Sequence, residues 1–142
     1  RSHSGALIVR NDEIVSTGYN GAPRGRSNCI DLGYCIRERL GIPAGERYEL
    51  CRSVHAEMNA IISAARSECI GGTIYLAGRD VATGELIPDL LPCPMCRRMI
   101  INAGLSKIVI RRTPSTYDIL NVQDWVFHDD SVIDPSESGE QA

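Results

Sequence analysis

Short apolar runs alternate with turn-forming residues at the start of the chain. Residues 5–10 and 13–19 are rich in β-branched and aliphatic side chains. Asn11 and Asp12 separate these runs, and this pair favours a two-residue turn. The pattern predicts a β-hairpin. Two later runs, residues 73–77 and 107–111, have the same character and are expected to be strands.

A helical period appears twice in the middle of the chain. Residues 54–66 are expected to form one helix, with Ser53 as its N-cap. A second helix is expected over residues 92–102, with Gly104 as its C-terminal stop. The buried stripe of the first helix is predicted from spacings of three and four residues: Met58, Ile61, Ile62 and Ala65.

The remaining stretches carry turn formers and polar residues. A long, partly helical loop is expected over 20–52, a loop or small hairpin over 78–91, helical or mixed structure over 114–128 and a frayed tail over 136–142. Strands that alternate with helices predict an α/β fold. The 142 residues suit a single domain with one core, so residues 1–142 are expected to form one domain.

Composition narrows the class of function. Apolar residues make up 43% of the chain and charged residues 23%, as in ordinary globular proteins. No apolar run approaches the roughly 20 residues of a membrane span, and no signal segment opens the chain, so a cytoplasmic protein without a membrane partner is expected. The net charge of −3 disfavours nucleic acid as a partner, because phosphate contacts need a basic surplus.

A metal-binding constellation lies at the two predicted helix starts. His55 opens the first helix, and Cys93 and Cys96 open the second. Residues three apart lie on the same face of a helix, and a helix start favours thiolate, so the two cysteines can share one ion. One imidazole and two thiolates suit Zn²⁺, and catalytic zinc sites keep three protein ligands with one open position.

Glu57 is the candidate proton carrier. It lies two residues after His55, where a carboxylate could reach the open zinc position without binding the metal. Zinc lowers the pKa of water toward neutrality, and a nearby carboxylate can accept the proton. His-x-Glu followed by Pro-Cys-x-x-Cys is the signature of zinc deaminases.

Other readings of these motifs stay open. A Cys-x-x-Cys pair also occurs in structural zinc sites and in thiol redox motifs. A structural site needs a fourth protein ligand, and the sequence offers none beside these three. A non-catalytic zinc module that senses nucleotides, and an editor that acts on a flipped base of RNA or DNA, are the two other classes considered.

Four segments resemble the deoxycytidylate (dCMP) deaminases of the cytidine deaminase superfamily. They are Gly-Tyr-Asn-Gly-Ala-Pro-Arg-Gly at 18–25, His-Ala-Glu-Met-Asn-Ala-Ile at 55–61, Pro-Cys-Pro-Met-Cys at 92–96 and Ile-Ile-Asn-Ala-Gly at 100–104. The resemblance extends over about residues 5–111. It implies a three-layer α/β/α fold with a five-stranded mixed sheet and a zinc ion between two helix starts.

The resemblance also implies an activity and a set of contacts. The expected reaction is the zinc-dependent hydrolysis of dCMP to dUMP and ammonia, with CMP or dCTP as alternative substrates. A homo-oligomer, a hexamer by resemblance, with dCTP and dTTP as effectors is expected. The implied substrate-binding residues are Asn20, Arg24, Arg26, Asn28, Val54 and Ala56. The two arginines suit the 5′-phosphate because guanidinium groups donate two parallel hydrogen bonds.

The chain departs from the family pattern in places. Residues 1–5 are too short for the family's N-terminal helix, so residues are expected to be missing there. The 78–91 loop is longer than the family's link into the zinc segment, and the sequence after Arg111 matches less well. Some relatives bind a second, structural zinc through thiols and a histidine in this region, so the resemblance suggests such a site here, with these ligands: Cys29, Cys35, Cys51 and His3. Buried free cysteines are the alternative, because the spacing is irregular.

Overall fold

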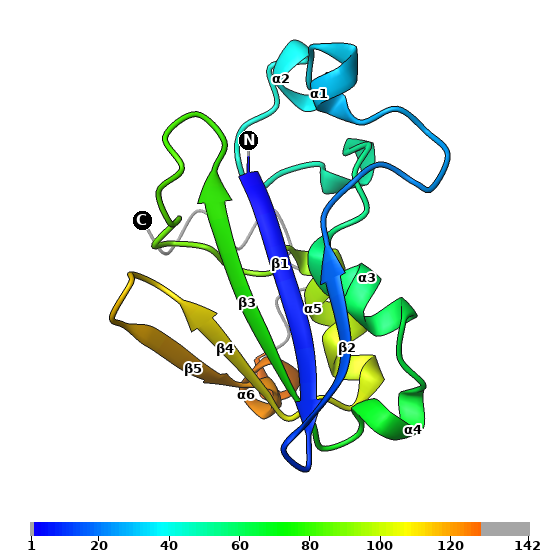
Figure 1. Cartoon of the computed structure of the whole chain (residues 1–142), viewed down its shortest axis with the longest axis vertical. Helices are drawn as coiled ribbons and strands as arrows, with labels where there is room; N and C mark the ends of the chain where they lie inside the picture. Colours follow the sequence, from blue (N-terminus) through cyan, green and yellow to red (C-terminus); the bar gives the residue numbers. More distant parts are fainter. Residues whose placement is uncertain (1, 129–142) are drawn as a thin grey trace.

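A five-stranded mixed sheet forms the centre of the protein (Figure 1). The computed structural model describes residues 2–128. The strand order is β2-β1-β3-β4-β5, and only the β3–β4 pair is parallel. The α/β class and the five-stranded mixed sheet are therefore confirmed. The strands are β1 (Ser2–Arg10), β2 (Glu13–Tyr19), β3 (Thr73–Asp80), β4 (Lys107–Arg111) and β5 (Tyr117–Asn121).

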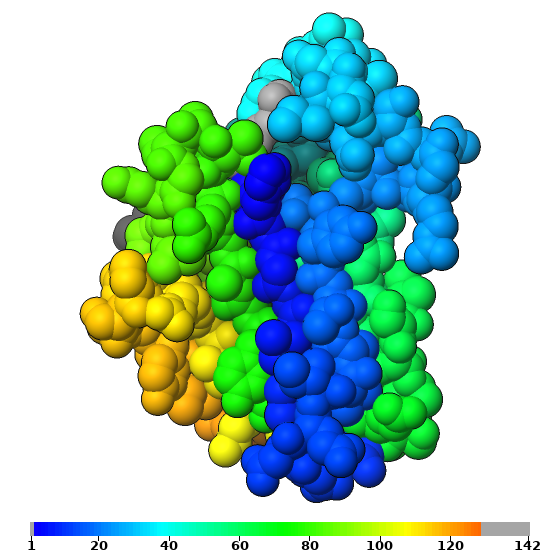
Figure 2. All heavy atoms as spheres, viewed as in Figure 1, coloured from blue at the N-terminus to red at the C-terminus, as the bar shows by residue number. Residues whose placement is uncertain are grey.

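The helices that contact the sheet lie behind it in Figure 1. Helices α3 and α5 pack against each other, and α6 packs against α5. Figure 2 shows the opposite face, where atoms of β1 and β3 lie at the surface. The helical elements are α1 (Cys29–Leu32), α2 (Ile36–Arg39), the 3₁₀ turn η1 (Tyr48–Leu50), α3 (Ala56–Ile62), α4 (Arg66–Cys69), α5 (Pro94–Ala103) and α6 (Val122–Phe127).

The core lies between the sheet and these helices. Alternate residues of the central strands point into it, because successive side chains of a strand face opposite sides. The helices contribute mainly small or aliphatic side chains. The core residues of the strands and of the two central helices are Ala6, Ile8, Ile74, Leu76, Ile108, Ile110, Ala56, Ala60, Ile100 and Ala103.

The predicted hairpin is confirmed. Asn11 and Asp12 both have positive φ angles, 52° and 61°, as a type I′ turn requires. β1 begins at Ser2, three residues before the predicted start, and pairs with β3 as well as β2. β3 likewise continues past residue 77 to Asp80.

The first predicted helix is shorter than expected. Residues 54–66 were expected to be one helix with a Ser53 N-cap, but α3 covers 56–62 and His55 is its N-cap. Val54 exchanges two backbone hydrogen bonds with Gly21, and this pairing keeps the chain extended up to His55. The chain breaks again after residue 62 before α4 begins.

The predicted buried stripe of this helix is wrong in part. Ile62 is 69% exposed, and Ala65 is exposed. The buried face instead carries Ala56 and Ala60, because β2 approaches the helix backbone at Gly18. A Cβ atom on this glycine would lie 2.4 Å from the Ala56 carbonyl oxygen and 2.4 Å from the Ala60 nitrogen.

The second predicted helix is confirmed with small shifts. α5 begins at Pro94, so Cys93 is the N-cap residue, and Gly104 ends the helix with a left-handed φ of 82°. Proline suits this first position because its missing N–H has no helical partner there.

The remaining predictions have mixed outcomes. The 20–52 loop contains α1, α2 and η1, as expected, and an Arg79–Leu86 bridge makes a small hairpin within 78–91. The 114–128 stretch holds β5 and α6. The tail at 136–142 lies outside the described residues. None of the helices in residues 2–128 has the length and apolar character needed to cross a membrane.

Candidate metal centre

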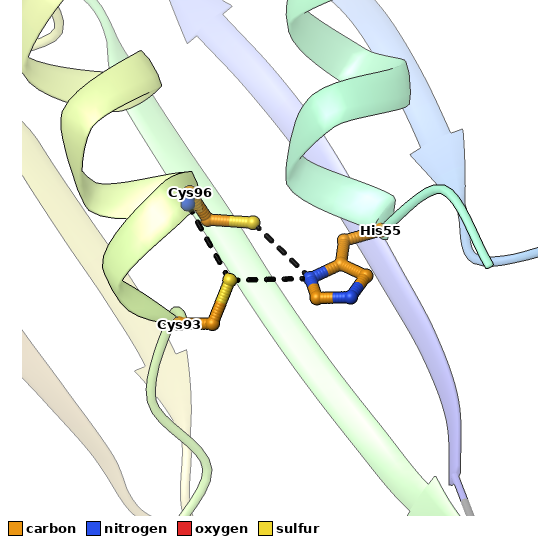
Figure 3. Close-up of side chains that lie close together, drawn as sticks. All are labelled: His55, Cys93 and Cys96. Atoms are coloured by element: carbon orange, nitrogen blue, oxygen red, sulfur yellow. Dashed lines mark hydrogen bonds between the residues drawn. The ribbon is translucent and has the colours of Figure 1, made fainter. Parts of the chain in front are cut away.

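The sequence-predicted metal ligands come together at the starts of α3 and α5. His55 and Cys93 are the N-cap residues of these helices, and Cys96 lies in the first turn of α5. Figure 3 shows the two sulfur atoms and the imidazole Nδ1 pointing toward one another between the helices. The group His55, Cys93 and Cys96 is the only potential metal-ligand set found among residues 2–128.

The distances within this group fit a zinc ion. The His55 Nδ1 atom lies 3.4 Å from Cys93 Sγ and 3.3 Å from Cys96 Sγ. A tetrahedral Zn²⁺ with ordinary Zn–S and Zn–N bonds places such donors about 3.6 Å apart. The backbone N–H of Cys96 also donates to the Cys93 sulfur at 3.4 Å, which favours a thiolate at this position. The donor set therefore suits zinc.

Glu57 lies beside this group and is not part of it. The residue is 6% exposed and lies in the first turn of α3. Burial raises the pKa of the Glu57 carboxyl, while a hydrogen bond with the Cys96 thiol partly offsets that effect. A buried carboxyl with a raised pKa is suited to accepting and returning a proton near neutral pH.

The three ligand groups influence one another electrostatically. Hydrogen bonds with Cys51 and Cys93 raise the pKa of His55 to about 10. The Cys96 thiol and the His55 ring stabilise the Cys93 thiolate and lower the pKa of Cys93 to about 4. The Cys93 thiolate and burial raise the pKa of Cys96. These shifts favour a thiolate at Cys93 beside a protonated imidazole at His55.

Two neighbours of His55 were missed by the sequence reasoning. The Cys51 thiol hydrogen-bonds the imidazole, which lowers the pKa of Cys51. The Tyr48 ring meets the imidazole edge-on, with centroids 5.7 Å apart and an interplanar angle of 89°. The guanidinium carbon of Arg37 lies over the Tyr48 ring, 4.1 Å from its centroid. No sequence spacing signals these contacts, because they depend on how the long loop folds back.

The expected substrate residues of the 20–28 loop lie on a segment that is hydrogen-bonded to residues just before His55. Gly21 pairs with Val54, and Arg52 donates to the Ser27 carbonyl oxygen at 2.6 Å. Asn28 accepts a hydrogen bond from the Ala22 nitrogen at 2.9 Å. The loop therefore approaches the residues that immediately precede His55.

The individual substrate contacts stay predictions. The amide of Asn20 bonds to β1, accepting from the Ser4 nitrogen and donating to the Ser2 carbonyl oxygen. Arg24 and Arg26 are exposed on the loop. The backbone N–H and carbonyl of Val54 both bond to Gly21, and Ala56 is buried beneath Gly18.

The hypothetical second zinc site is not formed in the described residues. Cys29, Cys35, Cys51 and His3 do not gather into a ligand group within residues 2–128. The contact between Cys51 and His55 gives one of these thiols a different environment. The three donor atoms of the first site lie within 4.8 Å of one another, and Cys51 is not part of that set.

Comparisons with known proteins find deaminases that resemble this chain in sequence or in fold. A deoxycytidylate deaminase of Mycobacterium phage D29 is 34% identical over 114 residues, which cover 77% of each chain. A deoxycytidylate deaminase of Schizosaccharomyces pombe is 33% identical over 105 residues, and the chain spans only 29% of that protein's length. The structure of a cytidine deaminase from Burkholderia pseudomallei shares the fold, with 20% identity and a TM-score of 0.53 over 87% of this chain and 78% of that one.

Family membership follows from the match over the metal-binding segments. The family model described as "Cytidine and deoxycytidylate deaminase zinc-binding region" matches residues 1–112, which include both helix starts. The chain therefore belongs to the cytidine and deoxycytidylate deaminase family.

Proposed function

We propose that this protein hydrolyses the exocyclic amine of dCMP, giving dUMP and ammonia. The observation that supports this proposal most strongly is the convergence of an imidazole and two thiols beside a buried carboxyl that is not a ligand. The phage relative of similar length is a deoxycytidylate deaminase, which favours a deoxynucleoside monophosphate over free cytidine.

His55, Cys93 and Cys96 are the proposed zinc ligands. When bound, Zn²⁺ supplies Lewis acidity and lowers the pKa of water toward 7. Both cysteines lie at the start of α5, where the helix N-terminus favours the negative charge of thiolates, and His55 is the N-cap residue of α3. Tyr48 packs against the imidazole and limits the orientations of its ring.

Glu57 is the proposed proton carrier. Its carboxylate accepts a proton from the attacking water and passes it to N3 of the cytosine ring, as a C–O bond forms at C4. It then takes the second proton of that water to the departing amine, and the C4–N bond breaks to release ammonia. The raised pKa of the Glu57 carboxyl suits both transfers, because the group must gain and lose a proton at neutral pH.

The finer features are also proposals. The substrate contacts rest on the family resemblance and on the hydrogen bonds between the 20–28 loop and the residues before His55. The residues assigned to these contacts are Asn20, Arg24, Arg26, Asn28, Val54 and Ala56. Residues 1–142 are proposed to act as one domain. A cytoplasmic homo-oligomer, a hexamer, regulated by dCTP and dTTP is likewise proposed from the resemblance alone.

A substrate panel tests the proposal. Ammonia release is measured with zinc-loaded protein and cytidine, CMP, dCMP, dCTP and adenosine. We expect the highest kcat/KM with dCMP and loss of activity after zinc is removed by a chelator. A higher kcat/KM with dCTP or CMP would mean that this nucleotide, and not dCMP, is the substrate. Nucleotide binding without ammonia release would favour a sensor.

A further inference from the structure

The segment that leads into Cys93 is held by two arginine side chains from different elements. Arg112 donates through one terminal nitrogen to the carbonyl oxygens of Pro88 at 3.0 Å and Leu90 at 2.6 Å. Arg97 of α5 donates to the Pro92 carbonyl oxygen at 3.0 Å. Three carbonyl groups within the five residues before Cys93 therefore accept hydrogen bonds from guanidinium groups.

Side-chain contacts dominate this segment. Within residues 2–128, the backbone hydrogen bonds of the preceding hairpin extend as far as Ile87, whose nitrogen bonds to the Gly78 carbonyl oxygen. Backbone hydrogen bonding then resumes at Cys93, whose carbonyl accepts from Arg97. Among residues 2–128, the guanidinium groups therefore accompany two apolar contacts in holding residues 88–92, because Leu90 packs against the core and Pro92 is fully buried.

Arg112 is itself fixed by the sheet. It follows the last residue of β4, and its side chain continues the alternation that points Ile108 and Ile110 toward the helices. Its Nε donates to an Asp118 carboxylate oxygen at 2.8 Å, and its backbone nitrogen donates to the Thr116 carbonyl oxygen at 3.0 Å. The Arg112 side chain is 16% exposed and that of Asp118 is 57% exposed, and hydrogen bonds from a charged donor are stronger than neutral ones.

We propose that Arg112 is a positioning residue for the metal centre: it ties residues 88–90 to the β4–β5 turn and so holds the approach to Cys93 in the geometry that the metal requires. The inference rests on the zinc site of the proposed function. Metal ligands depend on such outer contacts, because a ligand that must be ordered during binding costs affinity. The contact also explains how Cys93 keeps a defined position although the 78–91 loop before it is long.

Arg112→Met tests the proposal, with Arg111→Met as the matched control. Arg111 is the neighbouring residue and is exposed, and within residues 2–128 its side chain donates hydrogen bonds to the Thr113 and Pro114 carbonyl oxygens of its own turn. The zinc dissociation constant is measured by competition with a chelator, and the visible spectrum of the Co²⁺-substituted protein reports the ligand geometry. We expect Arg112→Met to weaken zinc binding by about 10- to 100-fold and to alter the Co²⁺ spectrum.

The control separates positioning from general stability. Arg111→Met is expected to keep the zinc affinity and Co²⁺ spectrum of the unmodified protein. A purely structural role for Arg112 would lower the melting temperature and leave the zinc affinity of the folded protein unchanged. That result, or equal zinc affinities for the two variants, would overturn the proposal.

Arg112→Lys keeps the test usable should the methionine variant fail to fold. A lysine ammonium keeps the charge but lacks the planar fork that reaches Asp118 and both carbonyl groups. We expect its zinc affinity to lie below that of the unmodified protein, and an unchanged affinity would count against the proposal. Zinc binding without ammonia release would refute the proposed reaction alone, because the zinc affinities would still decide the role of Arg112.

Discussion

The close contact of β2 with α3 at Gly18 gives a direct test of how the fold positions the metal centre. In a Gly18→Ala variant the new methyl group would lie 2.4 Å from two backbone atoms of α3, those of Ala56 and Ala60. Ordinary packing needs about 3.4 Å or more between such atoms, so the helix must move by roughly 1 Å. The helix resists this movement, because Ser16 and Asn59 bond it to β2 at 2.7 Å each.

The expected cost has two parts. Overpacking of this kind destabilises a protein by about 1 to 3 kcal/mol, which lowers the melting temperature of a domain of this size by roughly 4 to 12 °C. His55 immediately precedes α3 and Glu57 lies in its first turn, so both move with the helix. A misplacement of about 1 Å at a catalytic group can reduce kcat/KM on the order of 100-fold.

Gly5→Ala is the matched control. Gly5 lies in the adjacent strand β1, and a Cβ atom there would have no neighbour within 4 Å. Thermal melting and ammonia release from dCMP are measured for both variants. The reasoning predicts a large loss of both properties for Gly18→Ala and little change for Gly5→Ala. It is refuted if the two variants melt at the same temperature and turn over dCMP equally well.

Three further predictions concern the metal centre itself. Glu57→Gln should lower kcat about 10²- to 10⁴-fold with zinc still bound by metal analysis, and near-normal turnover would refute the proton-carrier role. Between pH 5 and 8, zinc must displace protons from His55 and Cys96 but not from Cys93, whose pKa is about 4. The logarithm of the zinc association constant should therefore rise by about 2 per pH unit. Ordinary pKa values give a slope near 3 below pH 6.5, and a slope of 3 in chelator titrations there would contradict the thiolate–imidazolium pair. Tyr48→Ala should weaken zinc binding about twofold to tenfold in the same titrations, while Tyr48→Phe keeps the ring contact and the affinity.

The metal ligands could be predicted from sequence because local spacing carries most of the information. Cys93 and Cys96 share one helix start, and His55 opens another, so a short pattern already places each ligand at a helix N-terminus. The hairpin was predictable for the same reason, since the turn pair between the two runs determines its geometry.

The limits of α3 could not be predicted, because they depend on contacts between distant residues. Val54 pairs with Gly21, more than thirty residues earlier, and this pairing delays the start of the helix. The close approach at Gly18 then buries alanines in place of the larger Ile62. Local periodicity contains neither contact, so it favoured a longer helix with a different buried face.

The surroundings of the ligands were hidden from the sequence for a related reason. Cys51 and Tyr48 reach His55 from the long loop, and Arg112 reaches the approach to Cys93 from the end of β4. Each of these contacts joins segments whose relative positions are set by tertiary packing. The family resemblance suggested a structural zinc site for Cys51, and the structure gives it a hydrogen bond to the imidazole.

Zinc K-edge X-ray absorption on the metal-loaded protein tests the account of the metal centre most directly. We expect one zinc per chain with two sulfur neighbours near 2.3 Å, one imidazole nitrogen and one further light-atom neighbour from solvent. A third sulfur neighbour, lost in Cys51→Ser, would mean that the protein fills all four positions. That result would make the site structural and would contradict its role in deamination.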